Sequence, residues 1–284
     1  MKKGLSILIG VFMVLMLAAC NSKAEPVNKQ EGSKNKEPSG LTLEQVFEKT
    51  AEASKELKSF KVKMNMKQDM SSDQDEALNE NVDSNIEMDV VQDPMAFHQK
   101  MSIKMPGSEK VMDMETYFSK DGMYYYDPTT QTWMKFPAEM MDQLVKVSDQ
   151  ETNPAAEIAN LKKFVDDFKF QQDDKSYILL LNASGEKYTD FLKETIQKTL
   201  PAGMGDSAKV FENMKINKMD YEIHIDKKTF YPTALNVNME LEMSVEGKTV
   251  KLVQDLKGQY VEHNQIKEIT IPQEVIKGAI ETGQ

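Results

Sequence analysis

Cys20 is the residue of this chain whose surroundings point most directly to a chemical modification. Two lysines near the N-terminus are followed by an apolar run over 5–17, which is too short to span a bilayer as a normal helix. The sequence Leu-Ala-Ala-Cys then ends at Cys20 and has the pattern of a lipobox. We therefore expect residues 1–19 to be a lipoprotein signal peptide and the Cys20 thiol to carry a diacylglyceryl group.

Cys20 is also the only cysteine among the 284 residues. An exported chain with one thiol has no disulfide framework, so the thiol is available for another purpose. Two acyl chains on one residue give stable membrane attachment, whereas a single chain does not. The predicted location is the extracellular face of a cell membrane, with the lipid as the anchor.

The remaining residues with catalytic potential form no recognisable catalytic set. His98, His224 and His263 are the only histidines, and no two of them have the spacing of a metal-binding pair. The alternating pattern puts His98 and His224 on the polar side of their strands, which favours solvated surface positions. No Gly-x-Ser-x-Gly segment is present. We expect no enzyme activity, no metal site and no cofactor.

An acidic run extends over residues 69–93, with nine carboxylates and no lysine. Asp73, Asp75 and Glu76 weakly resemble calcium ligands, but the glycine and the final glutamate of a calcium loop are missing. A solvated hairpin is the favoured interpretation, and a cation-attracting rim is the alternative.

Methionine is unusually abundant, with 21 residues. Most lie on the apolar side of alternating segments, where simple core packing accounts for them. A flexible thioether lining also suits a cavity that adapts to apolar ligands, and a Cu(I) site is the third interpretation. The candidate cavity lining comprises Met64, Met66, Met101, Met112, Met114, Leu161, Phe164, Phe191, Met239, Leu241 and Met243.

Composition limits the other classes of function. All 35 basic residues are lysine and the net charge is −11, so nucleic-acid binding is excluded on charge and on the lack of arginine. Residues 20–40 are expected to consist of the lipidated cysteine and a tether. The residues that follow Cys20 are polar and lysine-rich, which predicts a flexible tether of roughly 25 Å. Residues 41–284 are long enough for a single large domain.

Periodicity predicts mainly antiparallel strands interrupted by helices. A capping box at Thr42 opens a helix, and six alternating segments follow from Phe60 to Phe136. Helices are expected over 140–145, over 154–168 and over 188–196, and a central strand over 177–183. Residues 235–245 alternate strictly, and Lys257-Gly258 is expected to be a turn before another strand. The predicted class is α+β, with about ten antiparallel strands.

Two segments carry a resemblance to known proteins. They are 122–133, Gly-Met-Tyr-Tyr-Tyr-Asp-Pro-Thr-Thr-Gln-Thr-Trp, and 225–232, Ile-Asp-Lys-Lys-Thr-Phe-Tyr-Pro. With the order of elements, they resemble lipoproteins of the LolA/LppX-type fold and, more narrowly, a domain-of-unknown-function lipoprotein family of Bacillus-like Gram-positive bacteria. The resemblance implies a strongly curved antiparallel half-barrel with helices on its concave face. It implies a cavity for acyl chains and no catalytic residues.

Two functions follow as hypotheses. The first is a monomeric lipoprotein that binds a lipid or another amphiphile between the sheet and the helices. The alternative is a non-catalytic scaffold or sensor that binds a protein partner at the cell surface, with a filled interior. The volume of the cavity separates the two.

Overall fold

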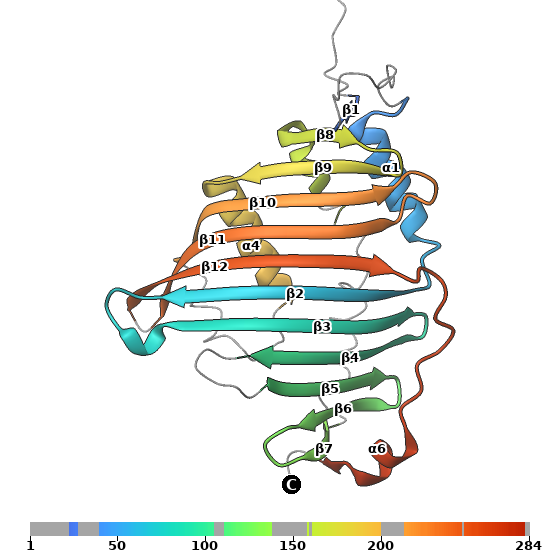
Figure 1. The fold of residues 1–284 in the computed structure, drawn as a ribbon, viewed down its shortest axis with the longest axis vertical. Coiled ribbons are helices and arrows are strands. Elements are labelled where there is room, and N and C mark those ends of the chain that lie inside the picture. The colour runs from blue at the N-terminus through green and yellow to red at the C-terminus, as the bar shows by residue number, and fades with distance from the viewer. Residues whose placement is uncertain are drawn as a thin grey trace, which may run out of the picture.

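A single open sheet of 13 strands dominates the computed structural model (Figure 1). The structure describes residues 23–27, 40–104, 111–137, 158, 161–199, 213–245 and 247–281. The strand order is β1-β8-β9-β10-β11-β12-β2-β3-β4-β5-β6-β7-β13. Neighbouring strands are antiparallel except at the two ends, where β1 pairs with β8 and β13 with β7 in parallel.

The first half of the chain forms one short strand, one helix and a six-stranded meander. Its elements are β1 (Glu25–Pro26), α1 (Leu43–Ser54), β2 (Ser59–Ser71), the 3-10 helix η1 (Glu76–Leu78), β3 (Glu80–Gln92), β4 (Met95–Lys104), β5 (Val111–Ser119), β6 (Gly122–Asp127) and β7 (Thr132–Lys135). The six-stranded meander β2–β7 confirms the predicted alternation.

The second half adds five long or medium strands, together with helices. Its elements are the 3-10 helix η2 (Leu161–Asp167), β8 (Phe168–Gln172), β9 (Ser176–Ala183), α4 (Glu186–Thr199), β10 (Lys215–Asp226), β11 (Pro232–Val245), β12 (Lys248–Val261), α6 (Gln273–Gly278) and β13 (Ile280–Glu281). The two halves meet where β12 pairs with β2, in a register that places Tyr260 opposite Val62.

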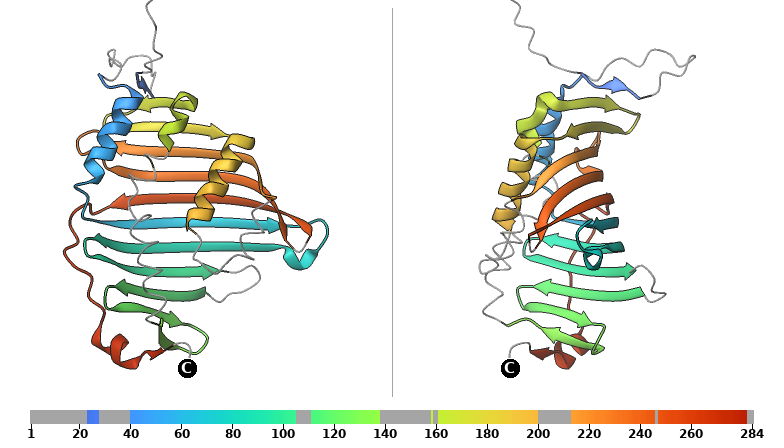
Figure 2. Two further views of the ribbon diagram at one scale, coloured as in Figure 1. Left: turned by 180° about the vertical axis from the view of Figure 1, so that it is seen from behind. Right: turned by 90° about the vertical axis from the view of Figure 1, so that its left-hand side faces the viewer.

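The sheet is broadly curved, and α1, η2 and α4 lie on the same side of it (Figure 2). We call this side the inner face. It carries the largest hydrophobic cluster, in which α1 and η2 pack on β8–β10. Within this cluster the ring of Phe47 meets Phe168 edge-on at 5.6 Å. A second cluster forms around Phe60, Val90 and Phe118 where β2–β5 begin or end.

The N-terminal helix α1 follows its sequence signals. Thr42 Oγ1 accepts a hydrogen bond from Gln45 N, and Gln45 Oε1 accepts one from Thr42 N. This capping box satisfies two backbone donors that a helix start leaves unpaired. Leu43, Val46 and Phe47 are buried on the inner side, as their 3.6-residue spacing predicts.

The structure is mostly β, and it exceeds the expected ten strands because β1, β8 and β13 were not foreseen. The spacing of Leu161, Val165 and Phe168 suggested a helix. Instead, η2 is a 3-10 helix with a non-helical backbone at Phe164 (φ −108°, ψ 19°), and Phe168 begins β8. Phe168, Phe170 and Gln172 are all buried, so the period of two decides this segment.

The expected turn at Lys257-Gly258 is wrong, because β12 continues through both residues. Gly258 lies in the strand interior, where a Cβ atom would stand 3.2 Å from the carbonyl oxygen of Leu235 on β11. The glycine therefore serves close backbone approach between strands. A tight turn through Asp121 connects β5 to β6, which pair through Ser119 and Gly122.

Other expectations fall outside the described residues. These are the modified Cys20, the signal peptide, most of the tether and the helix predicted over 140–145. Of the tether, residues 23–27 are described, and their β1 strand pairs with β8. Among the described residues, no helix is long and apolar enough to cross a membrane.

Candidate functional site

An apolar cavity of about 330 Å³ lies on the inner face between the helices and β10–β12. Helix α4 runs obliquely across these strands (Figure 2) and forms one wall. The walls comprise Ile158, Leu161, Phe191, Leu192, Thr195, Met219, Tyr221, Ile223, Pro232, Ala234, Leu235, Val237, Met239, Gln254 and Tyr260. We call this the inner pocket.

The floor of the inner pocket follows from strand register. Met219 lies opposite Met239, Tyr221 opposite Val237, and Ile223 opposite Leu235. Residues opposite one another in an antiparallel pair point to the same face, and side chains two apart do likewise. A strict alternation on β10 and β11 therefore supplies a continuous apolar floor.

A polar cluster fixes the helical wall. Asp167, at the end of η2, accepts hydrogen bonds from Lys187 Nζ at 2.6 Å and from Tyr188 Oη at 2.9 Å. The bond from Lys187, followed by that from Tyr188, holds the pKa of Asp167 below its usual value. Phe164 packs against Tyr188 and Phe191, with ring centroids 4.7 and 5.2 Å apart. Helix α4 is therefore joined to η2 by both charge and aromatic contact.

Few polar groups reach the inner pocket. Gln254 Oε1 accepts a hydrogen bond from Gln68 Nε2 at 2.9 Å, and Thr195 Oγ1 donates to Phe191 O at 2.9 Å. No lysine, aspartate, glutamate or histidine occurs among its described lining residues. Such walls favour an apolar molecule.

Three residues of the sequence-predicted lining lie in the inner pocket: Leu161, Phe191 and Met239. Phe164 is buried against Phe191 but is not part of the lining, and Leu241 is buried two residues along β11 from Met239. Met243 is next on the same phase, opposite Val250. The binding role of this set stays a prediction.

The other predicted methionines extend along the inner face, beyond the inner pocket. Met64 lies opposite Ile86, which lies opposite Met101, and Met101 lies opposite Met114. This row continues the floor of the pocket. Gly258 on β12 lies opposite Leu235 on one neighbouring strand and opposite Met64 on the other. Met66 and Met112 flank the row, and Met112 is 41% exposed. An apolar row therefore crosses from one half of the sheet to the other on the inner face.

Sequence reasoning missed most of the floor. Leu235 and Val237 were recognised as strand residues but not as lining, and Tyr221, Gln254 and Tyr260 were not singled out at all. The alternation of Met219, Tyr221 and Ile223 was a usable signal for one strand. The contribution of β12 depends on pairing between distant segments, and no local pattern reveals it.

The histidines are half-buried and form pairwise contacts. His98 Nε2 lies 2.7 Å from Glu115 Oε1, and its ring stacks on Tyr117 at 4.2 Å. His224 lies 2.7 Å from Glu222. His263 stacks on Tyr231, and burial lowers its pKa. Within the described ranges, no three acidic, histidine or cysteine side chains come together to hold a metal ion.

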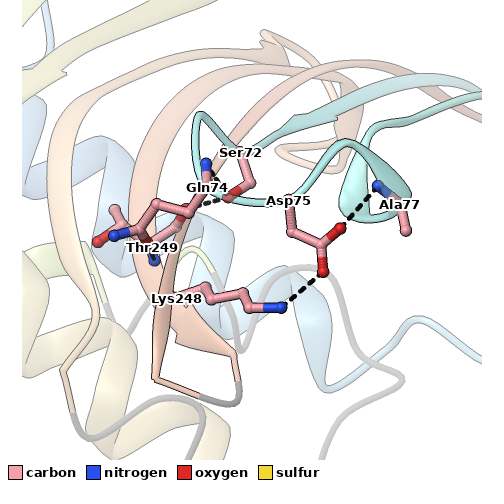
Figure 3. A network of polar contacts seen from close by, with 6 residues as sticks. All are labelled: Ser72, Gln74, Asp75, Ala77, Lys248 and Thr249. Carbon is pink, nitrogen blue, oxygen red and sulfur yellow. Dashed lines mark hydrogen bonds and ion pairs between the residues drawn. The ribbon is translucent and has the colours of Figure 1, made fainter.

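The acidic run contains a structured connection between β2 and β3. Asp75 accepts hydrogen bonds from Lys248 Nζ at 2.7 Å and from Ala77 N at 3.0 Å (Figure 3). Gln74 Oε1 accepts one from Thr249 N at 2.7 Å. The bond from Lys248, followed by that from Ala77, lowers the pKa of Asp75. Asp75 thus joins this connection to β12.

The aromatic cluster near Trp133 packs against the C-terminal segment. Tyr124, Ile271 and Val275 form a buried group, with Tyr117 and Trp133 packed beside it. Burial, followed by the charge of Glu115, raises the pKa of Tyr117 to about 12. These rings therefore hold α6 against the outer side of the sheet.

The fold and pocket define a class: open, curved, almost wholly antiparallel sheet proteins with helices and an apolar cavity on one face. The chain belongs to the family of unknown function DUF6612, whose model matches residues 42–280. This agrees with the sequence-based resemblance to a family of unknown function. No curated protein matches the chain.

Solved structures show only distant likeness. A DUF1329 family protein from Desulfovibrio piger has 6% identity and a TM-score of 0.27, covering 80% of this chain and 95% of that one. The S-type phycobiliprotein lyase CPES from Guillardia theta has 9% identity and a TM-score of 0.20, covering 80% and 96%. A beta-barrel-like DUF1849 protein from Brucella abortus has 9% identity and a TM-score of 0.21, covering 72% of this chain and 99% of that one. These values carry no functional argument.

Proposed function

We propose that this protein is a non-catalytic, membrane-anchored lipoprotein that binds the apolar part of a lipid or another amphiphile in the inner pocket. The observation that carries the proposal is the cavity of about 330 Å³ with apolar walls. This volume falls within the range of roughly 300–1,000 Å³ that is typical of small-molecule sites.

The chemistry of the walls supports an uncharged ligand segment. Phe191 and Leu192 are half-buried and offer apolar surface from the helix side. Met219 and Met239 offer unbranched thioethers that adapt to ligands of varied shape. A charged headgroup would remain outside, because the described walls hold no opposite charge to compensate its desolvation.

The proposal also includes the architecture implied by the resemblance, a LolA/LppX-type half-barrel. The apolar row from Leu235 through Met64 and Ile86 to Met101 and Met114 supports it. A longer acyl chain would extend from the inner pocket along this row.

Membrane attachment through diacylglyceryl on Cys20 is the second part of the proposal. Cys20→Ala should prevent lipidation and leave the protein either as uncleaved precursor or released to the medium. Cell fractionation with mass spectrometry of the N-terminus measures this. Normal processing and membrane retention of Cys20→Ala would refute the lipobox.

Ligand binding is tested with a fluorescent fatty acid, cis-parinaric acid, titrated into a soluble form of the protein that begins at Asn21 and needs no detergent. Val237→Phe adds bulk to the floor and should weaken binding at least tenfold. Asn236→Gln, on the opposite face of the same strand, is the matched control and should bind as the wild type does. If wild type shows no saturable binding, the interior is effectively filled, and the scaffold or sensor function becomes the better hypothesis.

A further inference from the structure

The start of the described chain is fastened to one edge of the sheet. Strand β1 pairs in parallel with β8, with Glu25 opposite Gln171 and Pro26 opposite Gln172. Val27 N donates to Gln172 O at 3.1 Å. This is the edge at one end of the long axis of the molecule (Figure 1).

Side chains reinforce this attachment. Ala24 is 0% exposed and belongs to the main hydrophobic cluster. Gln172 Nε2 donates to Ala24 O at 3.2 Å, and Gln172 Oε1 accepts from Lys227 Nζ at 2.8 Å. Lys23 forms an isolated bridge with Thr42, just before α1. The segment is therefore docked through both backbone and side-chain contacts.

The docked segment begins very close to the proposed anchor. Only three residue steps separate Lys23 from Cys20, and an extended chain spans at most about 11 Å over that length. A fully free tether over residues 20–40 would instead allow an excursion of roughly 25 Å. Docking of β1 thus shortens the effective tether by more than half.

We propose that the β1–β8 edge faces the lipid surface that carries the anchor, and that the sheet extends away from the membrane along its long axis. This inference rests on the proposed lipidation of Cys20. Thirteen strands at a spacing of about 4.8 Å place the β7–β13 edge up to about 60 Å further along the sheet. The inner pocket, at β10–β12, lies in the membrane-proximal half.

The distribution of acidic residues favours the same orientation of the sheet on the membrane. The nine carboxylates over residues 69–93 lie on β2, β3 and their connections, beyond the pocket from the β1–β8 edge. An anionic leaflet would repel this acidic part and oppose an arrangement in which the sheet lies flat on the membrane.

Energy transfer measures the orientation in the lipidated full chain. Lys175→Cys labels the β8–β9 turn, and Lys277→Cys labels α6 at the opposite edge; both residues are exposed. Because the Cys20 thiol is blocked by the lipid, each new cysteine carries the only reactive thiol. The labelled proteins are reconstituted on phosphatidylglycerol vesicles that contain a rhodamine-labelled lipid acceptor.

We expect transfer from the Lys175→Cys label to be several-fold more efficient than from the Lys277→Cys label. Equal efficiencies, or a reversed order, on vesicle-bound protein would overturn the proposed orientation. Flotation with the vesicles is measured separately. Absence of flotation would overturn the lipid anchor and, with it, this inference.

A matched pair of variants tests the docking itself. Ala24→Glu places a charge in a fully buried position and should detach β1, bringing the two efficiencies close together. Glu25→Gln, the exposed neighbour, should keep the several-fold difference. If Ala24→Glu also keeps the full difference, docking of β1 does not set the orientation and the proposal fails.

Discussion

Leu179, at the centre of β9, shows how sharply one residue separates the two faces of the sheet. It is 0% exposed on the inner face, whereas its neighbour Leu180 points to the other side and is only half-buried. Leu179→Ala should lower the free energy of unfolding by about 2–5 kcal/mol, because it leaves a cavity in the main core. Leu180→Ala should cost about 1 kcal/mol or less, because less apolar surface is buried.

Urea denaturation measures both variants, and Trp133, the only tryptophan, provides the signal. Equal losses for Leu179→Ala and Leu180→Ala would contradict the assignment of the inner face as the core. Both variants make the same Leu→Ala change at adjacent positions of one strand, so the two losses differ mainly through burial.

His263 makes a pH-dependent contribution to the free energy of unfolding. Burial lowers its pKa below 6.5, although its contacts with Pro232 O and with the charge of Asp226 oppose the shift. The unfolded chain therefore takes up a proton more readily than the folded chain. Its contribution is fully present above about pH 6.5 and is lost as the pH falls toward the lowered value.

We compare the urea midpoints of unfolding at pH 7.5, 6.5 and 5.5. As the pH decreases, the midpoint should fall more steeply in the wild type than in His263→Gln. The aspartates with lowered pKa, such as Asp75 and Asp167, titrate below 3.8 and do not contribute in this window. Identical slopes for the two proteins would show that His263 is not responsible.

At the scale of single residues, the sequence indicated which face of the sheet a side chain points to. It did not indicate which residues of other segments lie beside that side chain. The alternation on β11 put Met239 and Leu241 correctly on an apolar face. The roles of Tyr221 and Gln254 in the inner pocket could not be predicted, because they depend on the register of β10–β12 and on where α4 crosses them. Register is a property of pairs of segments.

At the scale of elements, Asp167 is the point where η2 and α4 are joined. Asp167→Asn removes the ion pair with Lys187 and weakens the contact with Tyr188. Amide hydrogen exchange over residues 186–195 should become several-fold faster, because the helical wall opens more readily. Asp166→Asn, a change at the exposed neighbour, is the control and should leave exchange as in the wild type.

Mass spectrometry of peptic peptides locates the exchange. Unchanged protection of α4 in Asp167→Asn would mean that the aromatic contacts of Phe164 alone hold the wall. In that case Phe164→Ala, and not Asp167→Asn, should accelerate exchange.

Elements with long, regular patterns were predictable, and short ones were not. The capping box of α1 and the alternation of β2–β7 and β11 were sufficient. Two-residue strands such as β1 and β13 have too few positions to show any period, and they form only because an existing edge offers unpaired groups. Gly258 was misread as a turn because glycine marks both turns and close strand approach.

At the scale of the whole molecule, the open sheet has two edges, and each is covered by a short strand from near one end of the chain. Strand β1 covers β8, and β13 covers β7. A long uncovered edge exposes a row of unpaired backbone groups that can pair with a second molecule. The two short strands therefore act against edge-to-edge association, and the monomeric state itself stays a prediction.

Removal of β13 tests this idea. A chain that ends at Gly278 uncovers the β7 edge, where Ile280 now pairs with Met134 and Glu281 with Lys135. We expect it to dimerise or to form larger species, whereas a chain that ends at Glu281 keeps the pairing and should sediment as the full chain does. Sedimentation velocity of the lipidated proteins in a density-matched detergent measures the difference. A monomer after removal of β13 would mean that Trp133 and its aromatic neighbours, rather than strand pairing, protect this edge.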